Sequence, residues 1–278
     1  MKYQEKLFSF EFSAPKSEES IAKIAKIHQK LSELKPHFFS VTYGAGGSTK
    51  DGTKQTVMDI HATGSRVAPH LSFGGDSKEK ISALLHDYKE AGVNRVVALR
   101  GDVPSGMGAS AKMAYASELV SFIREQTGDH FHIEVAAYPE MHPDSTNIET
   151  DLAFFKNKVE AGANSAITQY FYNPDAYFRF LEASAKLGVN IPIVPGIMPL
   201  TNYKMLVRFS DICGADIPRW IRKHLENYQD DPESLKAFGE ETVTRLCQRL
   251  LDGGAPGLHF YTLNQSLPVI KLWRNLGL

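Results

Sequence analysis

The chain has 278 residues, of which 42% are hydrophobic and 23% charged, and its formal net charge is −1. This composition is ordinary for a soluble globular protein, and the near-neutral charge argues against nucleic acid or an anionic membrane surface as a partner. Its two cysteines, Cys213 and Cys247, are too few for a disulfide framework and lack metal-binding spacing, so we expect a cytoplasmic protein.

The first residues, MKYQEKLFSFEFS, contain no continuous apolar core, so we expect no signal peptide. No apolar run reaches the roughly 18 residues of a membrane-spanning helix. Beyond this point, short β-rich runs recur along the chain. They lie at 7–14, 38–45, 66–73, 95–101, 132–139, 165–172, 191–198 and 257–263.

The segments between these runs have helical periodicity. In the first of them, apolar residues from Ile21 to Leu34 recur every three or four positions, and Ser17 is a suitable N-cap. Eight strands alternating with helices predict parallel pairing in a closed (β/α)8 TIM barrel, an α/β fold, over residues 1–278 as a single domain. Extra helices are expected in an insertion near residues 199–256, between strands seven and eight.

The main alternative fold is an open doubly wound sheet, which normally carries a Gly-x-Gly-x-x-Gly turn after its first strand. Here that strand ends in FEFSAPKS, which contains no glycine. The barrel is therefore favoured, and barrel chemistry takes place at the carboxyl ends of the strands. The residues predicted at that mouth are Glu11, Thr42, His70, Arg100, Asp102, Tyr138, His142 and Gln169.

Glu11 is an unusual residue for an apolar strand, because it lies between Phe10 and Phe12. An apolar environment would raise the pKa of this carboxyl and make it a proton donor near neutral pH. The alternative is a solvent-facing residue placed there by the strand's alternation. The fourth run ends in Arg100-Gly101-Asp102, which is open to interpretation as an adhesion motif, a structural ion pair or part of an active-site rim. Adhesion needs an exposed loop in a secreted protein, so the rim is favoured.

Several other site classes receive little support. The glycine-rich stretch 42–53 lacks the P-loop ending and is either a tight loop or a set of backbone amides facing a ligand. His70, His142 and His259 have no accompanying metal-ligand pattern, so no metal site is predicted. The eight runs contain no lysine, which argues against a Schiff-base aldolase. Acid–base chemistry on an organic ligand, or a bound organic cofactor, remains.

The strand ends carry a family resemblance that extends from about residue 7 to residue 265. FSFEFSAPK, FFSVTYGAGGST, APHLSF, VVALRGD, VAAYPEMHPDS, AGANSAITQYFY, PGIMPLTN and GLHFYTLN resemble, in order, blocks of the methylenetetrahydrofolate reductases. The resemblance implies a barrel that holds FAD without a Rossmann motif. It also implies ping-pong hydride transfer from NADH or NADPH through FAD to 5,10-methylenetetrahydrofolate, giving 5-methyltetrahydrofolate for methionine synthesis. A homo-oligomer is implied, and the similarity to short bacterial members favours NADH.

The resemblance also implies roles for individual residues. Glu11 matches the general acid that protonates folate N10, and Asp102 matches a carboxylate near the flavin that stabilises the folate cation. Gln169 matches an amide that binds the pterin, and Phe209 an aromatic that stacks on the bound substrate. The positions that match FAD contacts are Thr42, Tyr43, Ala45, His70, Leu99, Arg100, Gly101, Asp102, Tyr115, Ala116, Tyr138, His142, Asp151 and Lys158.

The chain departs from the family pattern beside the expected FAD phosphates. Phe154 and Asn157 stand where close relatives carry an asparagine and an arginine. Lys158 remains as a cation there, and Lys156 is a candidate substitute for the arginine. Weaker FAD binding is therefore one expectation.

Two further departures concern folate. Gln265, an expected substrate-binding residue, replaces an arginine that is frequent in the family, and Met205 replaces a glutamine. The sequence ends at Leu278, without room for the regulatory domain of eukaryotic relatives, so we expect no allostery by S-adenosylmethionine. A flavin-free pterin-binding barrel, such as a methyltransferase, is the alternative enzyme class, and the yellow colour of a flavoprotein distinguishes the two.

Overall fold

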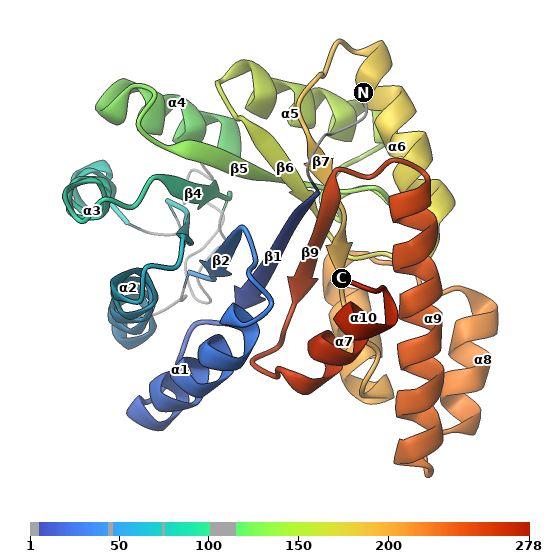
Figure 1. Ribbon diagram of the computed structural model, residues 1–278. Helices are drawn as coiled ribbons and strands as arrows, with labels where there is room; N and C mark the ends of the chain where they lie inside the picture. Colours follow the sequence, from blue (N-terminus) through green and yellow to red (C-terminus); the bar gives the residue numbers. More distant parts are fainter. Residues whose placement is uncertain (1–5, 44–46, 74–75, 101–114) are drawn as a thin grey trace.

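The computed structural model describes residues 6–43, 47–73, 76–100 and 115–278, with the side chains of residues 47–50 left undescribed (Figure 1). All strand pairs are parallel, and the sheet order is β7-β6-β5-β4-β3-β2-β1-β9-β8. The strands are β1 (Leu7–Phe12), β2 (Phe38–Val41), β3 (Val67–Leu71), β4 (Arg95–Ala98), β5 (His132–Ala137), β6 (Ser165–Thr168), β7 (Ile193–Val194), β8 (Gly196–Ile197) and β9 (Gly257–Tyr261).

The barrel is closed by the seventh predicted run, which forms two short strands rather than one. Pro195 separates β7 from β8, because proline has no N–H to donate to a neighbouring strand. β7 pairs with β6, and β8 pairs with β9. Pro195 still takes part in the sheet, since its carbonyl accepts a hydrogen bond of 3.0 Å from the His259 N–H. The described barrel therefore has eight strand positions, one of which is divided into β7 and β8. The prediction of a (β/α)8 barrel is confirmed.

Helices cover the outside of the sheet, as Figure 1 shows. Ser17 caps the first helix, its hydroxyl accepting from the Ser20 N–H at 3.2 Å, as the sequence predicts. The helices that follow strands in the regular pattern are α1 (Glu18–Ser32), α2 (Gly47–Ala62), α3 (Lys78–Glu90), α4 (Ala116–Thr127), α5 (Ile148–Glu160), α6 (Pro174–Lys186) and α10 (Leu267–Asn275). No described helix is both long and apolar enough to span a bilayer.

The predicted insertion between the seventh and eighth strand positions, that is between β8 and β9, is also present. It contains α7 (Tyr203–Cys213), α8 (Arg219–Asn227) and α9 (Pro232–Asp252). Pro218 directly precedes α8, where its fixed φ suits a helix start. This insertion matters for the site, because α7 returns to the mouth of the barrel and contributes side chains there.

Strand alternation divides the apolar side chains into two cores. A large outer core lies between sheet and helices and includes Phe10 and Phe12, which are fully buried. A small inner core, Phe38, Ala68, Val97 and Ile167, fills the barrel. Glu11 lies between Phe10 and Phe12 on β1, so its side chain points to the other side of the sheet, toward the barrel axis. That geometry brings Glu11 inside.

Candidate active site

A cavity of about 760 Å³ lies at the carboxyl ends of the strands. Its volume falls within the range of pockets that hold small organic ligands and cofactors. The predicted site residues that line it are Glu11, Thr42, Tyr43, His70, Leu99, Arg100, Tyr115, Ala116, Tyr138, His142, Asp151, Lys158, Gln169 and Phe209. Ala45, Gly101 and Asp102 lie outside the described residues. The fold thus brings positions from all along the chain to one place.

Gln265 does not join this group. It is exposed on the turn after β9, and its N–H donates to the Thr262 carbonyl at 2.9 Å. Leu263 and Asn264 have φ values of 50° and 54°, a left-handed conformation that residues other than glycine rarely adopt. Met205 is likewise outside the cavity lining. The expected folate contact at Gln265 therefore has no support from its position.

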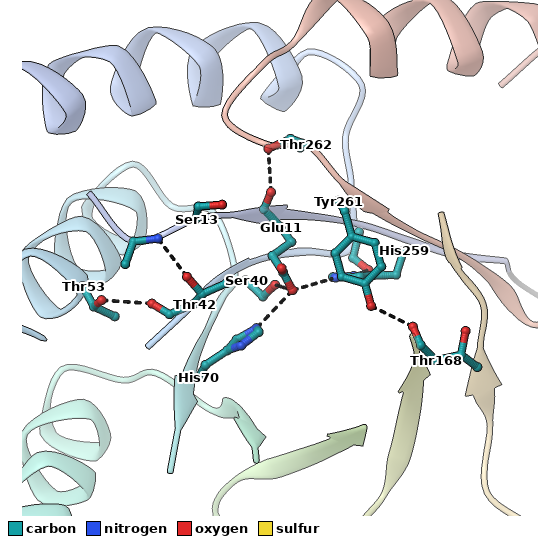
Figure 2. Close-up of polar contacts among 12 residues, drawn as sticks. Glu11, Ser13, Ser40, Thr42, Thr53, His70, Thr168, His259, Tyr261 and Thr262 are labelled. Carbon is teal, nitrogen blue, oxygen red and sulfur yellow. Dashed lines mark hydrogen bonds and ion pairs between the residues drawn. The ribbon is translucent and has the colours of Figure 1, made fainter. Parts of the chain in front are cut away.

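Glu11 lies at the centre of a polar cluster inside the barrel (Figure 2). Its Oε2 is 3.3 Å from His70 Nε2 and 3.4 Å from His259 Nε2, and Ser40 Oγ donates to it at 3.5 Å. Behind His259, Nδ1 lies 2.7 Å from Ser9 Oγ. Two imidazoles therefore contact one carboxylate, and a hydroxyl orients one of them.

The expectation that the pKa of Glu11 is raised is wrong. Burial does raise the pKa, but the charge of His70 and the hydrogen bonds from His259 and His70 outweigh it and lower the pKa to about 2. Phe10 and Phe12 do not surround the carboxylate, because alternation places them on the opposite side of the sheet. Glu11 is consequently ionised near neutral pH.

Arg100 occupies a second region of the cavity. Its guanidinium forms an ion pair with Asp144, which also lines the cavity. The arginine side chain is 29% exposed. Arg100 therefore forms an ion pair and lines the cavity at the same time. Two of the alternatives left open by the sequence, an ion pair and a place on the active-site rim, thus apply to the same residue.

Lys158 is the second cation of this region. Burial lowers its pKa to about 8; the charge of Asp151 raises the pKa in opposition, and that of Arg100 lowers it further. At this pKa the ammonium is mostly charged near neutral pH. Lys156, the candidate substitute, instead pairs with Glu160 and is not part of the cavity lining. Arg100 and Lys158 together provide positive charge suited to phosphate groups.

Another part of the cavity wall comes from β6 and α7. Gln169 follows β6, and its side-chain oxygen accepts from the Tyr170 N–H at 2.9 Å, so that within the described part of the chain its amide NH₂ is available for a ligand. Phe209, half-buried on α7, faces the same cavity. Tyr170 Oη lies 3.0 Å from Ser210 Oγ, so the helix that carries Phe209 is tied to the strand end that carries Gln169.

Glu140, in the loop after β5, makes a further connection to α7. Its carboxylate accepts from the Asp216 N–H at 2.8 Å. Burial raises the pKa of Glu140 to about 7, against the hydrogen bond from the Asp216 backbone, which lowers it. This contact joins the β5–α5 loop to the segment after α7, outside the cavity lining.

Sequence reasoning missed His259, Ser9 and Tyr261 as members of the site. Tyr261 lines the cavity, and its hydroxyl donates to the Thr168 carbonyl at 2.7 Å. Spacing was the available signal. Ser9 and Glu11 lie two residues apart on β1, as do His259 and Tyr261 on β9, so each pair shares one face of a strand.

Comparison with known proteins gives consistent results. The family model described as "Methylenetetrahydrofolate reductase" matches residues 1–277. The chain is 38% identical to 5,10-methylenetetrahydrofolate reductase of Pectobacterium carotovorum subsp. carotovorum, over 97% of this chain and 89% of that protein. It is 37% identical to the enzyme of that name from Escherichia coli (strain K12), over 97% and 90%.

Two further comparisons extend this picture. Methylenetetrahydrofolate reductase (NADH) 1 of Arabidopsis thaliana is 38% identical over 98% of this chain, which covers 48% of the plant protein. The structure of an uncharacterized Clostridium thermocellum protein that binds two copies of 5-methyl-5,6,7,8-tetrahydrofolic acid superimposes with a TM-score of 0.66. It is 16% identical and covers 98% of this chain and 94% of its own, so this likeness concerns the fold alone.

Proposed function

Because the chain belongs to the methylenetetrahydrofolate reductase family, which reduces methylenetetrahydrofolate, we propose that it does so by passing a hydride from a nicotinamide dinucleotide through bound FAD. One observation carries the proposal. A single cavity contains the polar cluster around Glu11 and a cationic region formed by Arg100 and Lys158. The first suits the opening of a folate ring and the second the phosphates of a dinucleotide.

The residues present fit FAD. Arg100 and Lys158 offer charge to its pyrophosphate, and Tyr138 and His142, whose rings lie 4.5 Å apart in an edge contact, form an aromatic wall beside them. FAD, when bound, supplies the capacity to accept a hydride and to donate it again. Ala45, Gly101 and Asp102 complete the proposed contacts, and Asp102 would add negative charge where the folate cation forms.

Glu11 is the proposed proton donor to folate N10. Because Glu11 is ionised near neutral pH, we propose that the imidazoles that contact it supply the proton. The Glu11 side chain is 14% exposed, against 7% for His70 and 0% for His259, so it is the most accessible of these three side chains. We therefore propose that the cluster stores the proton and that Glu11 delivers it.

Gln169 and Phe209 are the proposed folate contacts. The free amide of Gln169 would donate to the pterin, and Phe209 would stack on whichever substrate is bound. Because both substrates would then use one site in turn, we propose ping-pong kinetics. NADH is the proposed reductant, in keeping with the NADH-dependent name of the Arabidopsis relative. Residues 1–278 are proposed to act as one catalytic domain, in a homo-oligomer that supplies methyl groups for methionine synthesis.

Anaerobic spectroscopy tests the proposal. Purified protein reconstituted with FAD should show a flavin band near ~450 nm that NADH bleaches. Adding 5,10-methylenetetrahydrofolate should restore the band and yield 5-methyltetrahydrofolate. NADPH in a parallel experiment should bleach the band more slowly. Protein that stays colourless with FAD, or a band that folate does not restore, would contradict the proposal.

A further inference from the structure

Helix α7 forms part of the cavity wall but is itself held by few buried side chains. Phe209, Ile212 and Cys213, all near its carboxyl-terminal end, line the cavity. Among the 11 residues of the helix, Leu206 and Ser210 are the buried ones. A helix with so few buried contacts gains little packing energy that fixes its place. The position of the lining residues therefore depends on the contacts made at this end of α7.

The β5–α5 loop makes such a contact. Glu140, half-buried in this loop, accepts a hydrogen bond of 2.8 Å from the Asp216 N–H, two residues beyond the C-cap of α7. That cap, Gly214, has a left-handed φ of 73°. It packs so closely against the loop that a Cβ there would lie 3.0 Å from Pro143 Cγ. A hydrogen bond and close packing thus join the loop to the end of the helix.

We propose that Glu140 is a positioning residue, which sets the place of the substrate-binding wall by holding the carboxyl-terminal end of α7 against the β5–α5 loop. The inference rests on the proposed function, in which Phe209 stacks on the bound substrate. Glu140 is not part of the described cavity lining. It therefore acts through α7 rather than by touching substrate.

The loop is the fixed partner in this contact, because it has an anchor of its own. The His142 N–H donates to the Asp151 carboxylate at 3.3 Å, and Ser145 Oγ donates to the same carboxylate at 2.8 Å. Asp151 lies on α5, so these bonds tie the loop to that helix independently of α7. Loss of the Glu140 contact should consequently displace the end of α7 and leave the loop in place.

The contact requires an acceptor oxygen rather than a negative charge. Burial raises the pKa of Glu140 to about 7, the hydrogen bond from the Asp216 backbone lowers it, and the charges of Asp216 and Arg179 act in opposite directions. Near neutral pH the side chain is thus neutral in a part of the molecules. A carboxyl group accepts from an N–H in either form, and a glutamine amide oxygen does so as well.

The folate half-reaction of the full-length, FAD-reconstituted protein tests this inference, with 5,10-methylenetetrahydrofolate mixed anaerobically into the reduced enzyme. In Glu140→Ala, the folate concentration that gives half the maximal rate should rise about fivefold, the effect of one lost hydrogen bond. The rate at saturating folate and the affinity for FAD should stay within about twofold of wild type, because uniform substrate binding is what is lost.

Three further variants sharpen the test. Glu140→Gln should resemble wild type, because it keeps the acceptor oxygen. Gly214→Ala should raise the half-saturating folate concentration as Glu140→Ala does, because its Cβ would press on Pro143 from the side of the helix. Glu149→Ala removes an exposed carboxylate from the first turn of α5, outside the cavity lining, and is the matched control with no expected change.

The outcomes separate this inference from the proposed function. If folate reoxidises the wild-type flavin and Glu140→Ala has the wild-type half-saturating concentration, the positioning role is overturned while the proposed function stands. A loss of FAD affinity as large as the loss of folate affinity would also overturn it, since it would indicate a disturbance of the whole cavity. Failure of Glu140→Gln to restore folate affinity would overturn the role of the hydrogen bond. Wild-type flavin that folate does not reoxidise would contradict the proposed function itself.

Discussion

Glu11 and Glu134 both face the inside of the barrel, one near the carboxyl end of β1 and the other near the start of β5. The side chain of Glu134 is 3% exposed and forms an ion pair with Arg95. It also accepts from Ser165 Oγ at 2.6 Å and lies 3.4 Å from His132 Nε2. Glu11 has the two imidazoles and a serine hydroxyl around its carboxylate, and no arginine from the described ranges of the chain pairs with it.

Burial raises the pKa of each carboxyl, and the neighbouring groups outweigh burial: His70 and His259 lower the pKa of Glu11, whereas a hydrogen bond from His132 and then the charge of Arg95 lower that of Glu134. The difference between the two sites is therefore the arginine. Arginine holds its proton at all physiological pH values, so the pair of Glu134 with Arg95 is a fixed charge pair. Imidazoles gain and lose protons near neutral pH, so the surroundings of Glu11 permit proton transfer. The guanidinium of Arg95 also lies over the Phe38 ring, 4.6 Å from its centroid, which locks it into the inner core. The amino-terminal end of the barrel, where Glu134 lies, thus contributes to stability. The carboxyl end, where Glu11 lies, contributes the proposed chemistry.

The largest expected effect is on turnover and comes from removing the carboxylate of Glu11. Glu11→Gln should reduce steady-state turnover of 5,10-methylenetetrahydrofolate about 10³-fold, which is typical of losing general acid catalysis. Glu134→Gln should stay within a few-fold of wild type per folded molecule. NADH oxidation at saturating folate measures both. Similar losses in the two variants would remove the distinction between the barrel ends.

The second prediction concerns stability, where the order reverses. Glu134→Gln leaves the largely buried charge of Arg95 without its counter-charge and should lower the free energy of unfolding by about 3 kcal/mol. Glu11→Gln should cost less, because the Glu11 side chain is 14% exposed, against 3% for Glu134, and no arginine of the described residues pairs with it. Urea unfolding followed by circular dichroism gives both values. A greater loss of unfolding free energy in Glu11→Gln than in Glu134→Gln would show that the polar cluster around Glu11 also stabilises the fold.

A third prediction addresses the cationic region. Lys158→Met removes a charge that faces the cavity and should weaken FAD binding about tenfold. Lys156→Met, two residues earlier, removes only the cation paired with Glu160 and should have no effect on FAD affinity. Flavin fluorescence titration measures each. Equal affinities in the two variants would remove Lys158 from the proposed cofactor site.

The smallest effects are those on the pH dependence of stability. The pKa of Glu11 falls from 4.5 to about 2 on folding, so its contribution is present above pH 4.5 and lost as pH falls toward 2. The pKa of Glu140 rises from 4.5 to about 7, so its contribution is full below pH 4.5 and is lost as pH rises through 7. Urea midpoints between pH 5 and 8 should therefore fall less steeply in Glu140→Gln than in wild type. If the urea midpoints of wild type and Glu140→Gln changed with pH in parallel, the raised pKa of Glu140 would be contradicted.

The fold was predictable because it depends on local patterns. Eight apolar runs and the intervening helical periods specify a (β/α)8 barrel, and the mouth residues follow from where each run stops. The interruption at Pro195 follows from the missing N–H of proline, but its consequence, that β7 and β8 pair with different strands, depends on closure of the whole sheet.

The environment of Glu11 was not predictable, because the neighbours that set its pKa are distant in sequence. Phe10 and Phe12 are adjacent along the chain but lie on the opposite side of the sheet, whereas His70 and His259 come from β3 and β9. Gln265 shows a similar limit. It follows two residues with left-handed backbone, Leu263 and Asn264, a conformation that residues other than glycine rarely adopt and that the sequence did not indicate.

Separate half-reactions of Glu11→Gln, followed by anaerobic stopped-flow absorbance with Glu134→Gln as control, test most directly the claim that Glu11 delivers a proton to folate. The flavin band of Glu11→Gln should be bleached by NADH at close to the wild-type rate, while its recovery with 5,10-methylenetetrahydrofolate should slow about 10³-fold. Both phases of Glu134→Gln should resemble wild type. Equal slowing of the two phases in Glu11→Gln would contradict a role specific to folate protonation.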